Sequence, residues 1–221
     1  MGRVMRSCAT FRAILAYGLL SMIVNQSAAL AAPIRILAFG DSLTAGYNLP
    51  PGESFADQLQ TALRGKGYDA TVIQGGVSGD TTSGGKARLD WVLSGAKADH
   101  VILELGANDA LRGIDPKTVR TNLELMIGEI QGSGATLLLL GMMAPPNWGE
   151  GYQREFDRIY PELAKAHNVP LVPFFLDGVA MDPQLNQADG LHPNEKGVAV
   201  IVDHIAPEVA KLLSFKNGGG S

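Results

Sequence analysis

The sequence predicts an α/β protein with a parallel sheet and helices on both of its faces. Short apolar runs alternate with longer segments of helical spacing along the whole chain, and this alternation is typical of βαβ units. Three of these runs are followed by turns or loops rich in Gly, Asp or Asn, at 40–42, 75–82 and 106–109. The length of 221 residues and the hydrophobic content of 46% suit one domain with one core.

Five strands follow from the apolar runs. The first begins at Ile34 and breaks into the turn Gly40-Asp41-Ser42, and the others are expected at 70–73, 100–105, 136–140 and 169–175. The run 136–140 is apolar on both faces, as in a central parallel strand. Two prolines, Pro170 and Pro173, make the last run an edge strand.

Helical spacing and capping signals predict five helices between and after these strands. They are expected at 54–66, 87–93, 116–131 and 152–167, the last irregular near Pro161, and from just after Pro193 to about Leu213. The segment 75–82 is expected to be a Gly-rich loop. It lacks the Lys-Ser/Thr ending of a phosphate-binding loop and is no dinucleotide fingerprint.

The N-terminal segment has the pattern of a secretory signal peptide. Three arginines precede an apolar stretch at 13–24, which is too short to span a bilayer comfortably, and small residues follow at cleavage spacing around Ala29-Leu30-Ala31. We therefore expect a signal peptide at 1–31, a domain at 32–214, a flexible tail at 215–221, and export to the periplasm or beyond in a bacterium. An uncleaved N-terminal anchor is the alternative.

Composition excludes several classes of function. The formal net charge is −4, and it becomes −7 once 1–31 and its three arginines are removed, so nucleic acid is not an expected partner. The only cysteine, Cys8, leaves with the signal peptide, so the mature chain has no disulfide. No metal-ligand motif is evident, and we expect no metal and no cofactor.

Three of the predicted strands end in polar turns that could carry chemistry. Ser42, Gly79 and Asn108 follow successive strands, and in a parallel sheet such turns meet at the carboxyl edge. Ser42 is the candidate nucleophile, and its N–H, the Gly79 N–H and the Asn108 amide are candidate donors to an oxyanion. Each residue taken alone also has a purely structural interpretation. Asp41-Ser42 could cap a helix, Gly79 could be a turn glycine, and Asn108 could form a turn or cap a helix.

The general base that such a serine needs is His192. It lies in Asp189-Gly190-Leu191-His192-Pro193, where one turn can place the Asp189 carboxylate against the imidazole. Helix capping is the alternative interpretation of this segment. The other three histidines are placed less favourably: His100 precedes a strand at the opposite edge, His167 closes a helix, and His204 lies within the last helix as a surface residue.

Four blocks of this sequence, in this order, resemble those of the SGNH (GDSL) hydrolases. They are Gly40-Asp41-Ser42-Leu43, Gly79 within Val77-Ser78-Gly79-Asp80-Thr81, Gly106-Ala107-Asn108-Asp109, and Asp189-Gly190-Leu191-His192-Pro193. The segments 104–113 and 170–175 are similar to the arylesterase-like bacterial branch of this family. The resemblance covers nearly all of the chain from Ile34 to the last helix.

The resemblance implies a flavodoxin-like, three-layer α/β/α fold, and we expect a monomer without cofactor. It implies Ser42 as nucleophile, His192 as base, Asp189 as its partner, and an oxyanion hole from the Ser42 and Gly79 N–H groups and the Asn108 side chain. It also implies that the loop 145–151 borders an acyl-binding groove. The substrate-binding residues would be Pro146, Asn147, Trp148 and Tyr152. Packing of the two aromatic residues on their own helix is the alternative.

The function expected from these residues is an exported serine esterase for acyl or aryl esters, with thioesters and lysophospholipids as further substrates. Its partner is a small or lipid-like ester, and the mature chain has no membrane span. A carbohydrate O-deacetylase of the same fold is the first alternative. A metallophosphoesterase needs more His and Asp ligands than this sequence offers, and a non-catalytic lipid-binding module needs no such set of polar residues.

Overall fold

The computed structural model describes residues 32–217. The predicted signal peptide at 1–31 and the last four residues of the predicted tail lie outside the described residues. Within that range the chain forms a single compact unit from Pro33 onwards. No helix between residues 32 and 217 is both long and apolar enough to cross a membrane.

One parallel sheet of five strands forms the centre of the fold. Its strands are β1 (Ile34–Gly40), β2 (Ala70–Gly76), β3 (His100–Glu104), β4 (Thr136–Leu140) and β5 (Leu171–Val172). They are arranged in the order β2-β1-β3-β4-β5, all parallel, which is the flavodoxin-like order. The α/β prediction and the five-stranded sheet are therefore confirmed.

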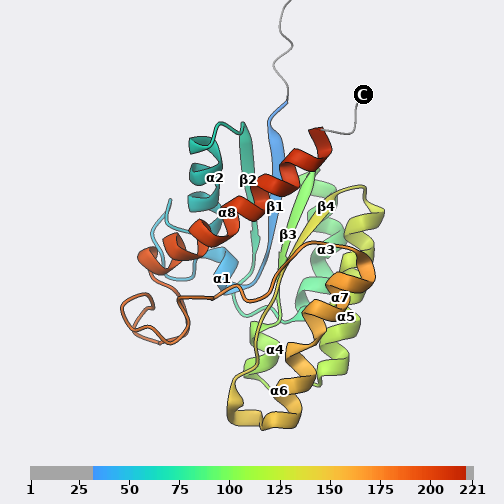
Figure 1. Cartoon of the computed structure of the whole chain (residues 1–221), viewed down its shortest axis with the longest axis vertical. Coiled ribbons are helices and arrows are strands. Elements are labelled where there is room, and N and C mark those ends of the chain that lie inside the picture. The colour runs from blue at the N-terminus through green and yellow to red at the C-terminus, as the bar shows by residue number, and fades with distance from the viewer. Residues whose placement is uncertain (1–31, 218–221) are drawn as a thin grey trace, which may run out of the picture. The chain divides into compact units, whose positions relative to one another are not determined.

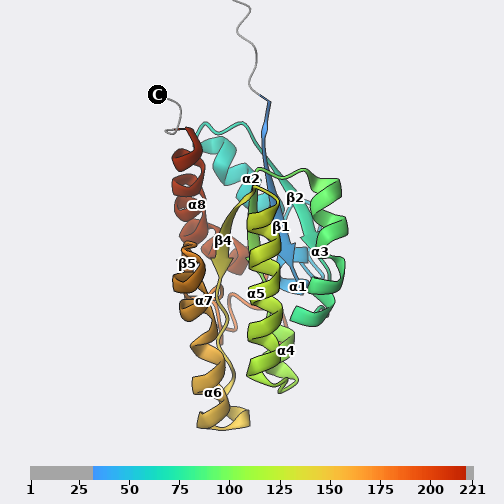
Figure 2. The same cartoon turned by 90° about the vertical axis from the view of Figure 1, so that its right-hand side faces the viewer.

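Helices cover both faces of this sheet, so the molecule has three layers (Figure 1 and Figure 2). The elements are α1 (Ser42–Ala45), α2 (Phe55–Gly65), α3 (Thr82–Ala96), α4 (Ala107–Leu111), α5 (Pro116–Gly132), the 3-10 helix η1 (Pro146–Trp148), α6 (Glu150–Asp157), α7 (Ile159–His167) and α8 (Glu195–Asn217). Helices α2 and α8 pack together on one face, and α3 and α5 pack together on the other. Helix α7 packs beside α5 and contacts β4 and β5.

Apolar side chains at helical spacing position these helices. In α2, Phe55, Leu59 and Leu63 are fully buried toward the sheet and α8. Ser54 caps the helix, because its hydroxyl accepts the Asp57 N–H and donates to the Asp57 carboxylate. The three inner strands are buried along almost their whole length, as β-strands covered on both faces must be.

The register of the strands brings their carboxyl ends to one edge. Gly40 of β1 pairs with Gly76 of β2, Phe39 pairs with Leu103 of β3, and Glu104 pairs with Leu140 of β4. The loops that follow β1, β2 and β3 therefore begin side by side. These loops carry Ser42, Gly79 and Asn108, as the sequence predicted.

Two elements are shorter than the sequence indicated. The fifth strand, expected over 169–175, covers only Leu171–Val172, because Pro170 and Pro173 on either side have no N–H to donate. The helix expected over 152–167 is two helices, α6 and α7, that meet at Arg158. Pro161 lies in the first turn of α7, where its ring excludes a hydrogen bond to the carbonyl four residues earlier.

Two helices are longer than expected. Helix α3 spans Thr82–Ala96 rather than 87–93. Its glycines suit close packing, since a Cβ at Gly85 would lie 2.3 Å from the Leu105 side chain. The loop expected over 75–82 is shorter, because Gly75 and Gly76 end β2 and Thr82 begins α3. Helix α8 continues to Asn217, so the first three residues of the predicted tail are helical.

Candidate active site

Ser42 lies at the first turn after β1 and begins α1. The turn is tight, because a Cβ at Gly40 would lie 2.2 Å from Thr44 Oγ1. The Asp41 carboxylate accepts the Leu43 N–H at 2.9 Å and caps α1, so the capping role expected as an alternative is present. Capping does not account for the Ser42 hydroxyl, which points to another loop.

His192 joins Ser42 to Asp189. Its Nε2 lies 2.9 Å from Ser42 Oγ and its Nδ1 lies 2.7 Å from Asp189 Oδ2. The N–H groups of Leu191 and His192 both donate to Asp189 Oδ1. These two backbone hydrogen bonds, followed by the bond to the imidazole, lower the pKa of Asp189 to about 2. Asp189 is therefore an anion at neutral pH, and it favours the tautomer with a proton on Nδ1 and a free lone pair on Nε2.

Asn108 is held beside the serine turn by Asp41. Its Nδ2 donates to Asp41 Oδ2 at 3.0 Å, which leaves the second hydrogen of the amide for another acceptor. Gly106, with a φ of 123°, starts the turn that places Asn108 on α4. Any side chain at that position would collide with the Tyr160 hydroxyl, 2.0 Å from the Cβ position.

Gly79 lies in the left-handed region, with a φ of 85°, where a glycine avoids the strain of a side chain. Its carbonyl accepts the Arg112 guanidinium at 3.1 Å, which ties it to the end of the α4 turn that carries Asn108. Among residues 32–217, no hydrogen bond uses the N–H of Gly79 or that of Ser42. Both groups are available as donors to a ligand.

Two buried carboxyl groups lie behind the serine. Burial raises the pKa of Asp41 to about 6, although the Leu43 N–H and the Asn108 amide oppose this rise. Burial and the nearby Asp41 raise the pKa of Glu104 well above its usual range. Glu104 Oε2 accepts the Asp41 N–H and the Thr44 hydroxyl.

The loop after β4 is attached to α4 through its aromatic side chains. Trp148 Nε1 donates to the Ala110 carbonyl at 2.8 Å, and the Tyr152 hydroxyl donates to the Ile114 carbonyl at 2.9 Å. The Trp148 indole also covers Gly113, where a Cβ would lie 2.8 Å from the ring. Pro146 and Asn147 are exposed. The loop therefore borders the Asn108 turn, and Trp148 stays half exposed.

The other histidines lie where the sequence placed them. His100 begins β3 at the amino edge, with its Nδ1 2.6 Å from Thr136 Oγ1. His167 ends α7, and His204 is exposed on α8. In the described part of the chain, no group of three His, Cys, Asp or Glu side chains is placed to hold a metal ion.

Several contacts at the site were not expected from the sequence. They are the bond from Asn108 to Asp41, the Arg112 contact to Gly79, and the ring of Tyr47, whose centroid lies 4.6 Å from that of the His192 imidazole. Asp41 could have been suspected, since it directly precedes Ser42. For Tyr47 and Arg112 the sequence carries no comparable signal.

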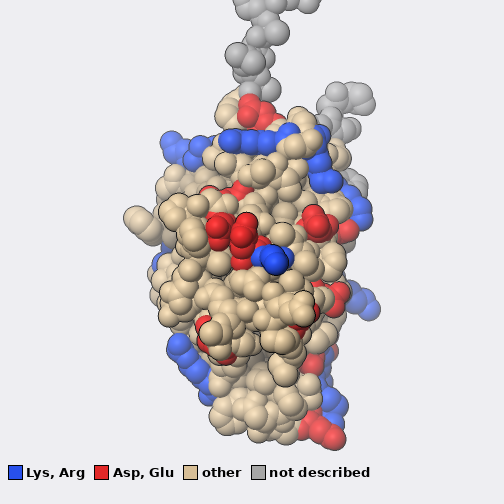
Figure 3. All heavy atoms as spheres, turned by 90° about the vertical axis from the view of Figure 1, so that its left-hand side faces the viewer, with Lys and Arg blue, Asp and Glu red and all other residues tan. Residues whose placement is uncertain are grey.

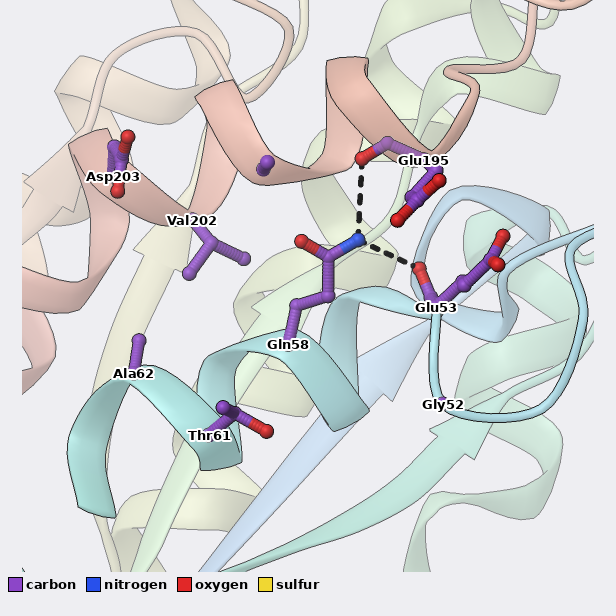
Figure 4. A pocket seen from close by; sticks show the side chains of 9 residues that line it. Gly52, Glu53, Gln58, Thr61, Ala62, Glu195, Val202 and Asp203 are labelled. Carbon is purple, nitrogen blue, oxygen red and sulfur yellow. Dashed lines mark hydrogen bonds between the residues drawn. The ribbon is translucent and has the colours of Figure 1, made fainter. Parts of the chain in front are cut away.

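A separate groove of about 350 Å³ lies between α2 and the first half of α8. Its rim is acidic, with Glu53, Glu195 and Asp203, and Figure 4 shows Gln58 in its centre. The Gln58 amide donates to the backbone carbonyls of Glu53 and Glu195, so it ties α2 to α8. Ser42 and His192 do not line this groove.

Known proteins of similar sequence and structure are ester hydrolases. Residues 38–200 match the GDSL-like lipase/acylhydrolase family. The chain belongs to this family. An arylesterase of Vibrio mimicus is 44% identical over 187 residues, which cover 85% of this chain and 94% of that protein.

Two solved structures of esterases are also similar to this member of the family. AlinE4, described as an SGNH-hydrolase family esterase, has a TM-score of 0.70 and 49% identity over 82% of this chain and 97% of its own. The psychrotrophic esterase EstA from Pseudoalteromonas sp., inhibited by monoethylphosphonate, has a TM-score of 0.77 and 35% identity over 81% of this chain and 98% of its own.

Proposed function

We propose that this protein is an exported serine esterase that hydrolyses acyl and aryl esters through an acyl-enzyme on Ser42. The observation that carries the proposal is the chain of contacts from Ser42 Oγ through His192 to Asp189, at 2.9 and 2.7 Å, beside two unused N–H groups and the Asn108 amide. This is the set of groups that acyl transfer needs: a nucleophile, an oriented base and oxyanion donors. It needs no cofactor, and the enzyme acts as a monomer.

In the first half-reaction, Ser42 Oγ bonds to the ester carbonyl carbon while His192 Nε2 takes the hydroxyl proton. Asp189 stabilises the imidazolium that forms. The negative carbonyl oxygen accepts hydrogen bonds from the N–H groups of Ser42 and Gly79 and from Asn108. The carbon–oxygen bond to the leaving group then breaks, and the departing alcohol receives the proton from His192.

The second half-reaction releases the acid. A water molecule gives its proton to His192 as its oxygen bonds to the acyl carbon. The bond to Ser42 Oγ then breaks, and Ser42 recovers its proton from the imidazolium. Thioesters follow the same course with a thiol as the leaving group, and lysophospholipids do so with a glycerol hydroxyl.

The surroundings of the site favour acyl chains over sugars. Nine large apolar side chains are exposed among the described residues, and seven of them lie on segments that follow the carboxyl ends of the strands. These seven are Tyr47, Val77, Leu111, Met143, Trp148, Met181 and Leu191. Exposed apolar side chains at this end of the molecule suit contact with a hydrocarbon chain. We assign the contact with the acyl chain to Trp148 and Tyr152, with Pro146 and Asn147 at the outer rim.

Charge is distributed in agreement with this assignment. In the space-filling view of the side that lies on the left in Figure 1, acidic side chains gather near the middle, and the area below them, toward the carboxyl ends of the strands, is mostly uncharged (Figure 3). A neutral ester with an apolar chain meets little electrostatic opposition there.

Hydrolysis of p-nitrophenyl esters from acetate to palmitate by the wild type and by Ser42→Ala tests the proposal. We expect the wild type to prefer chains longer than acetate, and the variant to lose turnover while it keeps its circular dichroism spectrum. A variant that retains most of its activity would refute the serine mechanism. Faster release of acetate from acetylated polysaccharide than from aryl acetates would favour the deacetylase instead.

Export has its own test. The proposal predicts cleavage of the full-length chain after residue 31 in a bacterial host, and mass spectrometry of the protein in the periplasmic fraction measures it. Full-length protein retained in the inner membrane would instead indicate an uncleaved anchor.

A further inference from the structure

One side chain outside the proposed catalytic set links both backbone segments of the oxyanion site. Arg88 lies on α3, and its side chain is 20% exposed. Its Nε donates to Asp80 Oδ2 at 2.6 Å, its Nη1 to the Gly75 carbonyl at 2.8 Å, and its Nη2 to the Gly40 carbonyl at 2.9 Å. The guanidinium also lies 4.0 Å from the centroid of the Phe39 ring.

The partners of Arg88 lie close in sequence to the two backbone donors. Gly40 precedes Ser42 by two residues, and Asp80 directly follows Gly79. The guanidinium therefore connects the end of β1, just before the Ser42 N–H, with the loop after β2, just after the Gly79 N–H. Among the described residues, no other side chain makes hydrogen bonds to both of these segments.

The peptide between Gly40 and Asp41 is held from both sides. Its carbonyl accepts Arg88 and also the Val77 N–H at 3.0 Å, and its own N–H donates to Glu104 at 3.2 Å. A peptide plane fixed on both sides cannot rotate without breaking one of these bonds. The direction of the following backbone, which carries the Ser42 N–H, is set by this arrangement.

The chemistry of the arginine side chain suits this role. A guanidinium presents its N–H groups in a rigid planar fork, so one side chain can hold three acceptors in a fixed relation. A lysine keeps the charge but has a single nitrogen on a flexible stem. It cannot reach Asp80, Gly75 and Gly40 with the same geometry.

We infer that Arg88 is a positioning residue that sets the separation of the Ser42 and Gly79 N–H groups, and thereby their fit to the oxyanion. This inference rests on the proposed esterase function for its effect on rate. It concerns the transition state, because the ground-state carbonyl oxygen does not yet need both donors. The expected result of loosening Arg88 is a lower kcat with little change in KM.

The test compares Arg88→Lys with a matched control, Arg35→Lys. Arg35 also holds a backbone carbonyl, since its Nε and Nη2 donate to Ala96 at 2.9 and 2.7 Å, but it lies at the amino end of β1. We expect kcat on p-nitrophenyl butyrate to fall about 10- to 100-fold in Arg88→Lys, the range in which misplaced catalytic groups act. Arg35→Lys should keep its kcat near that of the wild type.

A readout that does not depend on turnover accompanies the kinetics. The backbone amide signals of Ser42 and Gly79 in ¹H–¹⁵N NMR spectra should shift in Arg88→Lys and stay in place in Arg35→Lys. If the wild type hydrolyses no ester, the proposed function fails. The amide shifts still decide whether Arg88 sets the positions of the Ser42 and Gly79 N–H groups. Unchanged amide shifts, or equal loss of kcat in both variants, would overturn the inference.

Asp80→Asn covers the case in which Arg88→Lys does not fold. This variant weakens only the contact between Arg88 and the Gly79 loop and leaves both backbone carbonyl contacts in place. We expect a shift of the Gly79 amide and a smaller loss of kcat, with KM within about threefold of the wild type. A wild-type Gly79 signal together with wild-type kcat would count against the inference.

Discussion

Asp41→Asn should remove a pH-dependent part of the folding stability that arises from burial of this carboxyl group. Asp41 is fully buried, and burial raises its pKa from 3.8 to about 6. The folded protein therefore binds this proton more tightly than the unfolded chain does. The contribution of Asp41 favours folding most below pH 3.8, and it is lost as the pH rises through 6.

The size of the effect follows from the two pKa values. A rise from 3.8 to about 6 corresponds to about 3 kcal/mol over the whole range, at about 1.4 kcal/mol per pKa unit. Lowering the pH from about 8 to about 5 recovers about 1.4 kcal/mol of this free energy of unfolding. The remainder, half or more, is recovered only below about pH 5. With a urea m-value of about 2 kcal/mol/M, this is a shift of the unfolding midpoint by about 0.7 M.

Urea unfolding at these two pH values, followed by circular dichroism, measures the difference. The wild type should gain about 1.4 kcal/mol more than Asp41→Asn on going from about pH 8 to about pH 5. Tyr160→Phe is the control, because burial raises the pKa of Tyr160 well above its usual value of 10 and therefore above this window. Its pH dependence should match that of the wild type. Equal pH dependence in wild type and Asp41→Asn would refute the reasoning.

Two further substitutions test groups around the site. Asn108→Ala removes one proposed oxyanion donor and the partner of Asp41, so kcat on p-nitrophenyl butyrate should fall by about 10²- to 10³-fold. A kcat within about threefold of the wild type would contradict this role. Tyr160→Phe leaves the buried Leu105 carbonyl without the hydroxyl that donates to it at 2.8 Å. It should lower the free energy of unfolding by about 1 to 3 kcal/mol in urea titrations, and an unchanged midpoint would argue against that bond.

Local signals in the sequence were sufficient for the elements that carry the site. The apolar run before Gly40 and the glycine turn after it predicted a strand and a tight turn, because both depend on residues that are near in sequence. The pairing of His192 with Asp189 was also predictable, since one turn separates them. The parallel arrangement then placed Ser42, Gly79 and Asn108 at one edge without further information.

The contacts between loops could not be predicted in the same way. Arg88 reaches Gly40 because α3 crosses behind β1 at a particular distance, and 48 residues separate the two positions. Prolines in the sequence indicated both the weak fifth strand and the break before Pro161. Where each element ends also depends on which carbonyl groups of neighbouring segments accept a hydrogen bond there, and the sequence does not show this. Helix α3 was underestimated because its glycines lower helix propensity, while packing against Leu105 favours them.

The attachment of Trp148 to α4 also makes the loop after β4 observable by fluorescence. The chain has two tryptophans, and the other, Trp91, is 81% exposed on α3. A Trp91→Phe variant therefore leaves one indole, whose N–H is bonded to Ala110 and whose ring covers Gly113. Its emission spectrum and its quenching by iodide would report directly whether this loop stays on α4 or lifts from it when an ester analogue binds.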